Sequence, residues 1–84
     1  MKYFVYLIIS KNKQKYLSYV GYTNNLKKRL AKHNSSKGAK FTRGRKWILI
    51  YKKRFKTKSE AMSFEYKLKK NRKQRKIILQ NFNK

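Results

Sequence analysis

Only two residues of this 84-residue chain carry a carboxylate side chain, and one of them is placed where it could do chemistry. Glu65 follows Ala61 by four residues and precedes Leu68 by three, so on a helix it would share their apolar face. An unpaired carboxylate buried there would be strongly destabilising unless a counter-charge, a metal ion or a cleft open to water compensates it. Glu65 is therefore a candidate ligand for a divalent cation, with a salt bridge to one of the many lysines as the alternative.

Glu60, the other acidic residue, has a structural explanation. It lies three residues after Thr57, and Thr-x-x-Glu is the pattern of a capping box at a helix N-terminus. A carboxylate in the first helical turn also interacts favourably with the helix dipole. The spacing predicts a helix that begins just after Thr57 and leaves Glu65 as the carboxylate available for function.

Arg29 and His33 are candidates for binding a phosphate. With Leu26 and Leu30 they follow the spacing i, i+3, i+4, i+7, so a helix would turn all four toward the sheet. The guanidinium of Arg matches a phosphate in shape and stays charged, and His can bond a phosphate oxygen or a water. A solvated basic helix edge explains the pattern equally well. The opposite helix face would carry Lys27, Lys28 and Lys32.

Two tyrosines complete the set of candidates. They occur in Phe4-Val5-Tyr6 and Tyr19-Val20-Gly21, on adjacent expected strands. Because the chain has seven Tyr and the residue is common in strands, either one alone would be an ordinary core or surface residue. Gly21 near the end of its strand predicts a bulge or a close approach of another group to the backbone.

The net charge of +24 indicates a polyanionic partner. Coding bias toward A and T would raise the number of lysines but would not deplete the acids, whereas binding phosphates releases counterions and favours such a surface. We expect DNA, with RNA also compatible, and no membrane partner, since no segment is a basic amphipathic anchor and no apolar run reaches roughly 18–20 residues. The absence of Cys excludes disulfides and thiolate metal sites and fits a cytoplasmic protein, which we expect to associate with the nucleoid.

These residues would be positioned by one α+β domain that spans residues 1–84. The strand 2–10 is apolar on both faces and should be central. Polar residues 10–15 should connect it to the next strand, and residues 35–45 should form a loop. The expected order is β-β-α-β-α-α: strands 2–10, 16–22 and 46–55, a helix from Thr23 or Asn24 to Asn34, a helix from Thr57 to about Asn71, and, after a basic stretch, a short closing helix around Ile77–Phe82.

The ordered set of motifs resembles the GIY-YIG nuclease family, and within it the small stand-alone bacterial proteins. The resemblance runs from Phe4-Val5-Tyr6 through Tyr19-Val20-Gly21, Arg29 and His33 to Glu65, and so covers nearly the whole chain. The first motif has Phe4 where the family has Gly. Tyr22 stands where several repair members carry Lys.

The resemblance implies a three-stranded antiparallel sheet flanked by helices, and hydrolysis of DNA phosphodiesters with one divalent cation, Mg²⁺ or Mn²⁺. It implies that Tyr6 and Tyr19 line the cleft near the attacking water, that Arg29 holds the scissile phosphate and that Glu65 binds the metal. His33 matches a site position that holds Tyr or His. Either Tyr6 or His33 could be the general base; the resemblance favours a Tyr, whose pKa a nearby metal and Arg29 would lower.

The expected function is a metal-dependent endonuclease directed to branched or damaged DNA, as in DNA repair, rather than to a sequence. A monomer is favoured. A non-catalytic module that binds DNA or structured RNA, and a ribosome-associated basic protein, are the alternatives. Basic residues expected to follow the nucleic-acid backbone, besides those of the first helix, are Lys37, Lys40, Arg43, Arg45, Lys69, Lys70, Arg72, Lys73, Arg75 and Lys76.

Overall fold

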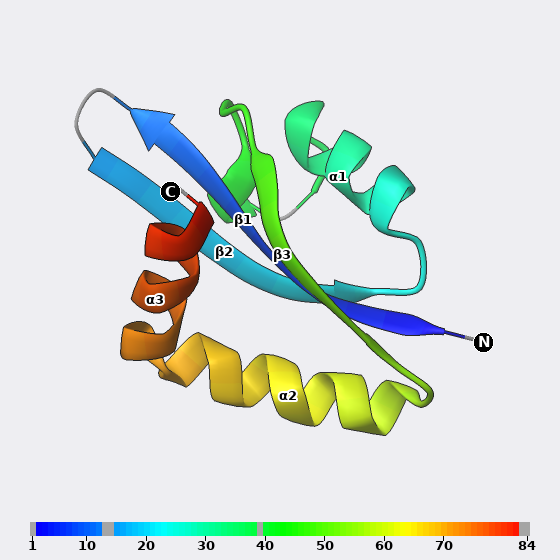
Figure 1. Cartoon of the computed structure of the whole chain (residues 1–84). Coiled ribbons are helices and arrows are strands. Elements are labelled where there is room, and N and C mark those ends of the chain that lie inside the picture. Colours follow the sequence, from blue (N-terminus) through cyan, green and yellow to red (C-terminus); the bar gives the residue numbers. More distant parts are fainter. Residues whose placement is uncertain (1, 13–14, 39, 83–84) are drawn as a thin grey trace.

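The computed structural model describes residues 2–12, 15–38 and 40–82 of the chain. Its elements follow the predicted order, with one additional short helix before the third strand (Figure 1). They are β1 (Tyr3–Asn12), β2 (Lys15–Thr23), α1 (Leu26–Asn34), the 3₁₀ helix η1 (Lys40–Thr42), β3 (Ile48–Phe55), α2 (Lys58–Lys70) and α3 (Arg72–Phe82). The expectation of an α+β fold with a three-stranded antiparallel sheet is confirmed.

The strand β1 lies in the middle of the sheet, whose order is β2-β1-β3. Both neighbours are antiparallel to it, and the register places Tyr6 opposite Gly21 and Ile8 opposite Tyr19. The register to β3 shifts between Leu7 and Ile8, where β3 carries a bulge. The central place of β1 agrees with its apolar side chains on both faces, since only a strand covered on both sides buries such a run.

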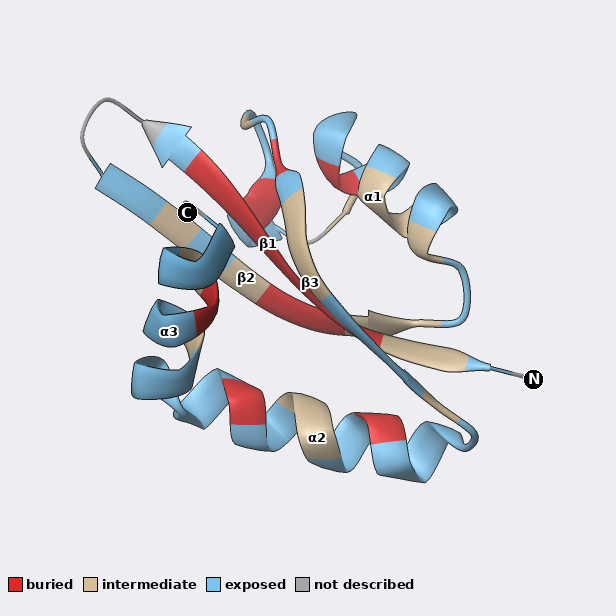
Figure 2. Ribbon diagram, in the orientation of Figure 1, coloured by how far each residue is buried: buried red, intermediate tan, exposed pale blue. Residues whose placement is uncertain are grey.

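Two separate cores lie on the two faces of the sheet (Figures 1 and 2). Alternate residues of β1 divide between them. Tyr6 and Ile8 pack with Trp47 and the leucines of α1. On the other face, Val5 and Leu7 pack against the buried residues of α2 and α3. The sheet is therefore the middle layer, with α1 on one side and α2 and α3 on the other (Figure 1).

The helix starts confirm one sequence prediction and correct another. Thr57 caps α2 as predicted: its Oγ1 accepts a hydrogen bond from the Glu60 amide at 3.1 Å, and its hydroxyl donates to Glu60 Oε1 at 3.0 Å. The cap of α1 is Asn25 rather than Thr23 or Asn24, because the Asn25 side chain accepts from the Lys28 amide at 3.1 Å.

The last helix begins earlier than predicted, so the basic stretch from Arg72 to Lys76 is helical. Asn71 ends α2 and starts α3, since its Oδ1 accepts from the Gln74 amide at 3.0 Å. Other bounds differ by a few residues: β1 and β2 extend into the predicted connection, of which residues 13–14 lie outside the described residues, and β3 starts at Ile48. Across the described parts of the chain, no helix has the length and apolar character needed to cross a membrane.

Candidate active site

A chain of hydrogen bonds connects Tyr6 on β1, His33 on α1 and Thr42 in η1. The Tyr6 hydroxyl lies 2.7 Å from His33 Nε2, and His33 Nδ1 lies 2.9 Å from Thr42 Oγ1. All three side chains are buried, and His33 has no exposed surface at all. Both ring nitrogens of His33 are thus engaged inside the protein, so the imidazole reaches bound molecules through Tyr6 rather than directly.

Two glycines leave the space that this arrangement needs. A Cβ atom at Gly21, the residue opposite Tyr6, would lie 2.7 Å from Tyr6 Cζ and closer still to its hydroxyl. A Cβ at Gly38 would lie 3.0 Å from His33 Cε1. The close approach predicted at Gly21 is therefore confirmed, and its partner is the tyrosine of the first motif.

The loop that carries Thr42 is held by Asn34 and Trp47, two residues that the sequence did not single out. The Trp47 amide donates to Asn34 Oδ1 at 2.6 Å, and Asn34 Nδ2 donates to the Trp47 carbonyl at 3.2 Å. The buried Trp47 indole donates to the Thr42 carbonyl at 2.9 Å. These bonds join the end of α1 to the start of β3 and place Thr42 behind His33.

An aromatic cluster opens from this buried chain toward the surface. The ring of Tyr19, on β2, has its centroid 5.1 Å from that of His33 and 6.4 Å from that of Tyr6. On its outer side, Phe41 of η1 stacks on Tyr19 at 6.3 Å with an interplanar angle of 22°. Phe41 is 53% exposed, so the cluster ends in an aromatic surface at the mouth of the site.

Arg29 brings a fixed positive charge beside Tyr6. It is half-buried on α1, and its interaction with the Tyr6 hydroxyl raises the pKa of the guanidinium. Its Nε atom is buried and lacks a hydrogen-bond partner among the described residues. A buried donor without a partner is costly and suits a residue that completes its bonding with a bound anion.

Burial controls the protonation of the Tyr6–His33 pair. It raises the pKa of Tyr6 above the usual value of 10.0, and this effect outweighs the lowering by Arg29. Arg29 thus acts on the pKa of Tyr6 in the direction expected from the sequence. Burial and, secondarily, the charge of Arg29 lower the pKa of His33 below 6.5, so at neutral pH both groups are uncharged.

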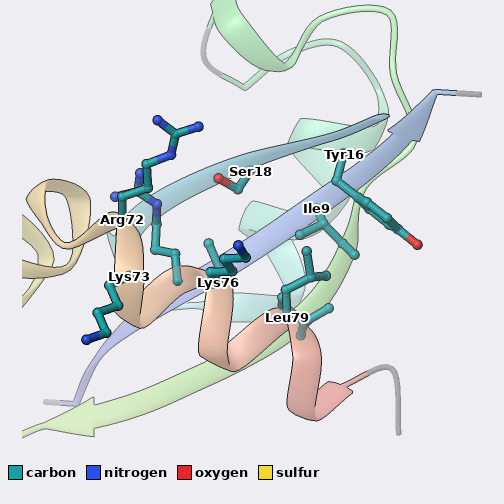
Figure 3. A pocket seen from close by; sticks show the side chains of 10 residues that line it. Ile9, Tyr16, Ser18, Arg72, Lys73, Lys76 and Leu79 are labelled. Atoms are coloured by element: carbon teal, nitrogen blue, oxygen red, sulfur yellow. The ribbon is translucent and has the colours of Figure 1, made fainter. Parts of the chain in front are cut away.

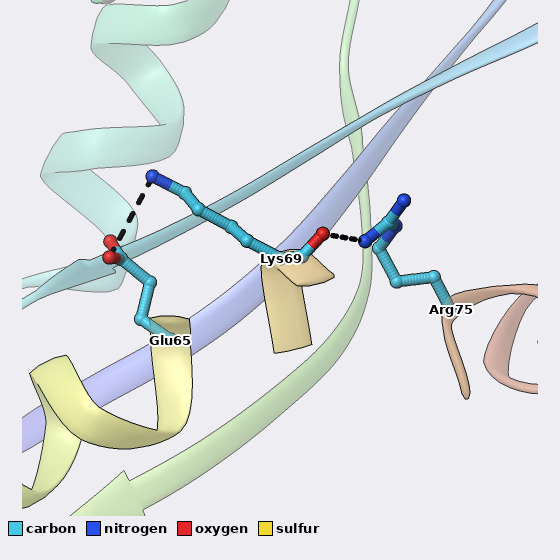
Figure 4. Close-up of polar contacts among 3 residues, drawn as sticks. All are labelled: Glu65, Lys69 and Arg75. Carbon is cyan, nitrogen blue, oxygen red and sulfur yellow. Dashed lines mark hydrogen bonds and ion pairs between the residues drawn. The ribbon is translucent and has the colours of Figure 1, made fainter. Parts of the chain in front are cut away.

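Glu65 approaches this cluster from α2. Its side chain is 17% exposed and pairs with the Lys69 ammonium at 3.7 Å (Figure 4). The same Lys69 Nζ lies 6.0 Å from the centroid of the Tyr19 ring, and the charge of Glu65 raises the pKa of Tyr6. The salt bridge given above as the alternative for Glu65 is therefore present, and it lies beside the predicted site residues.

The donor set around Glu65 fits Mg²⁺ or Mn²⁺. Among the residues described, no three His, Cys, Asp or Glu side chains lie together as metal ligands, so Glu65 would be the protein's single carboxylate ligand. One carboxylate completed by water and substrate phosphate oxygens is a usual arrangement for Mg²⁺. In the structure the Lys69 ammonium pairs with this carboxylate at 3.7 Å.

The basic residues expected to follow a nucleic-acid backbone lie on several surfaces. Most are exposed; Arg45 and Arg75 are half-buried. Arg75 also donates hydrogen bonds to two carbonyls at the end of α2, that of Leu68 and that of Lys69, the second of which Figure 4 shows. It therefore stabilises the α2–α3 corner, a structural role that the sequence did not predict.

Comparisons with known proteins find relatives that are similar to this chain in sequence. The UPF0213 protein SH2523 of Staphylococcus haemolyticus is 42% identical over 77 residues, which cover 90% of each chain. The UPF0213 protein CPE1444 of Clostridium perfringens is 47% identical over 75 residues, 88% of this chain and 80% of that protein. A shorter match, 56% identical over 52 residues, covers 61% of this chain and 60% of the UPF0213 protein OB0043 of Oceanobacillus iheyensis.

A solution NMR structure of the UPF0213 protein BH0048 from Bacillus halodurans is 37% identical, covers 94% of this chain and 85% of its own, and has a TM-score of 0.48. Residues 2–78 of this chain match the protein family described as "GIY-YIG catalytic domain". Because that match runs from the start of β1 into α3, the chain belongs to the GIY-YIG family, whose domains are of the nuclease type.

Proposed function

We propose that this protein is a divalent-metal-dependent endonuclease that hydrolyses DNA phosphodiester bonds at branched or damaged structures. The observation that carries the proposal is the convergence of five candidate residues from four elements. Tyr6 on β1, Tyr19 on β2, and Arg29 and His33 on α1 interact with one another. Glu65 on α2 joins them through Lys69, whose ammonium pairs with Glu65 at 3.7 Å and lies 6.0 Å from the centroid of the Tyr19 ring. A protein that only bound phosphates would not need a buried tyrosine that is hydrogen-bonded to a histidine.

The proposed roles follow from the protonation states. Arg29 binds the scissile phosphate, since its charge is fixed and its Nε lacks a partner among the described residues. Tyr6 accepts the proton of the attacking water while its own hydroxyl proton moves to His33 Nε2. This transfer requires the His33 tautomer in which Nδ1–H donates to Thr42 Oγ1, and the distances of 2.7 and 2.9 Å suit it.

Glu65 would hold the divalent cation, which supplies positive charge to the developing phosphorane and leaving oxygen. Tyr19 packs against the His33 ring and limits the motion of both. The Lys69 ammonium pairs with Glu65, so a cation bound to Glu65 would displace it. Lys69 would then bind a phosphate oxygen instead. His33 is a positioning residue and proton acceptor, since Tyr6 separates it from the substrate.

The test is cleavage of labelled single-stranded, duplex, flap and branched DNA by the wild type and by Glu65→Gln, with Mg²⁺ or Mn²⁺. We expect cutting of a branched or flapped substrate, reduced about 100-fold or more in Glu65→Gln, while DNA affinity is kept or increased. Glu60→Gln is the matched control, because Glu60 accepts a hydrogen bond from Thr57, the cap of α2, and its replacement should leave cleavage unchanged.

A non-catalytic DNA-binding module is the second candidate, and the Glu65–Lys69 ion pair favours it, since a salt bridge alone explains this carboxylate. Under that function the wild type binds DNA without cutting it. Equal metal-dependent cleavage by wild type and Glu65→Gln would contradict the role assigned to Glu65. Preference for structured RNA without cleavage would favour a ribosome-associated protein instead.

A further inference from the structure

A pocket of about 710 Å³ lies on the face of the sheet opposite Tyr6, between the strands and α3 (Figure 3). Apolar side chains form much of its lining, among them Ile9, Ile50 and Leu79, and the aromatic ring of Tyr16 stands at one end. Its other lining residues include the four basic side chains Arg72, Lys73, Arg75 and Lys76. We call this space the α3 pocket.

The α3 pocket adjoins the candidate active site around the edge of the sheet. A smaller cavity of about 260 Å³ is lined by Tyr19, Phe41 and Lys69, which belong to the site or its mouth. Ser18 and Arg75 line both this cavity and the α3 pocket. Because β2 is an edge strand, no further strand separates the two faces at this point. A ligand chain can therefore pass from the site around β2 into the α3 pocket.

The chemistry of this path suits an unpaired nucleic-acid strand. Neither cavity has an acidic residue in its lining, and the cations of α3 and Lys69 can contact successive phosphates. The exposed ring of Phe41 and the 40% exposed ring of Tyr16 offer surfaces on which bases can stack. A duplex keeps the faces of its bases covered, so only an unpaired strand can use the aromatic and apolar lining.

We infer that the path from Phe41 around β2 into the α3 pocket binds an unpaired DNA segment next to the scissile phosphate. The inference rests on the proposed nuclease function and makes it more specific. The substrate class is DNA in which a single-stranded tail or flap adjoins the cleavage position. Bases stack on Phe41 and Tyr16, and Lys73 and Lys76 follow the phosphates.

The test measures binding without cleavage, with Glu65→Gln and no divalent metal. Fluorescence anisotropy compares blunt duplex DNA with the same duplex bearing a 3′ or a 5′ tail, a tail of abasic sites, or an RNA tail. We expect one DNA tail to tighten binding about tenfold or more, as one or two stacked bases would, and an abasic tail to give much less. Equal gain from the abasic tail, or a larger gain from RNA, would overturn the inference.

Matched variants test whether the gain comes from this path. Tyr16→Ala and Phe41→Ala should each remove most of the tail-dependent gain. Tyr66→Ala and Phe82→Ala alter aromatic residues of similar exposure outside both cavities and should keep it. Loss of the gain in all four variants would contradict the inference.

Crosslinking locates the bound tail on a protein in which no aromatic residue has been replaced. A tail that carries 5-iodouracil should crosslink to Tyr16 or Phe41, and crosslinks confined to α1 would contradict the path.

The proposed nuclease function and the inferred strand path can fail separately. Tail-dependent binding by a protein that cuts no DNA with metal would contradict the proposed function alone. Cleavage of blunt and tailed DNA at equal rates, without any tail-dependent gain, would contradict the inference alone.

Discussion

His33 is the single histidine of the chain, so its ionisation can be followed without overlap from another imidazole. Burial and the charge of Arg29 lower its pKa, because the protonated ring would lie in a site that already holds a guanidinium. We expect the Hε1 resonance of His33 to titrate below the usual value of about 6.5 in an NMR pH series. Titration at or above that value would contradict the buried, neutral imidazole.

The same shift predicts how stability depends on pH. Below about pH 6.5 the unfolded chain takes up a proton on His33 that the folded chain resists, so the free energy of unfolding falls as the pH decreases toward the folded-state pKa. Above about pH 6.5 His33 is neutral in both the folded and the unfolded chain, so it no longer makes the free energy of unfolding depend on pH. Urea unfolding between about pH 5.5 and about pH 7.5 measures the slope. The slope should vanish in His33→Gln, whatever the absolute stability of that variant.

At the residue scale, the sequence predicted which side chains meet but not what supports them. Helical spacing turned Arg29 and His33 toward the sheet, and the structure confirms that direction. Thr42 was not predictable, because its contact with His33 depends on how a loop closes, and loops carry no periodic signal. The sequence could not predict that Lys69 is the partner of Glu65, because the chain has 20 lysines and no local pattern distinguishes them.

At the scale of elements, the pairing of β1 with β2 determines the geometry of the site. Gly21→Ala adds a methyl group against the Tyr6 ring, and Tyr6 has little freedom to move because it is 2% exposed. We expect a loss of about 1–3 kcal/mol in the free energy of unfolding, typical of overpacking, and displacement of the Tyr6 hydroxyl from His33. Urea denaturation and the chemical shift of His33 Hε1 measure the two effects.

A double variant separates this steric effect from a general weakening of β2. The nearest atom to the added Cβ is the Tyr6 hydroxyl, so Tyr6→Phe combined with Gly21→Ala should cost less than the sum of the two single changes. Additive costs would indicate that the alanine acts on the strand rather than on Tyr6.

Element types were predictable from the sequence where one strong pattern acted. The two-faced apolar run predicted the central strand, and Thr57 with Glu60 predicted the start of α2. The start of α3 was predicted too late, because Arg, Lys and Gln favour helices without producing any apolar periodicity. The cap of α1 was predicted one or two residues too early, because Thr23, Asn24 and Asn25 are all good N-caps.

At the scale of the whole molecule, the charge of +24 should make folding and DNA binding respond to salt in opposite directions. Salt screens the repulsion within the folded chain, and relief of about 1 kcal/mol would raise the Tm by about 4–8 °C. DNA affinity should fall with salt, with a log–log slope of about −0.9 for each phosphate neutralised. Thermal unfolding and anisotropy titrations over the same NaCl series test both directions, and a Tm that decreases with salt would contradict the first.

The position of the candidate site at the edge of the sheet depends on the arrangement of the whole molecule. Tyr6 faces α1, whereas Glu65 lies on α2 on the other side of the sheet. The Glu65–Lys69 pair reaches the ring of Tyr19 on the edge strand β2, an arrangement that depends on strand order and on the path of α2. Local patterns carry no information on that path. From the sequence, only the resemblance to a known family predicted that these residues belong to one site.

The scarcity of carboxylates has a consequence for the ions around the protein. Glu65 is held by Lys69 and Glu60 by Thr57, so nearly all of the 26 cationic side chains must find their counter-charges among dissolved anions. DNA then displaces bound anions from the protein as well as cations from its own phosphates. The chemical identity of the anion should therefore change the affinity for DNA. At equal potassium concentration, replacing chloride by the weakly adsorbing glutamate should tighten the complex. In the cell, a nucleic acid that binds this surface must compete with the small anions already bound there.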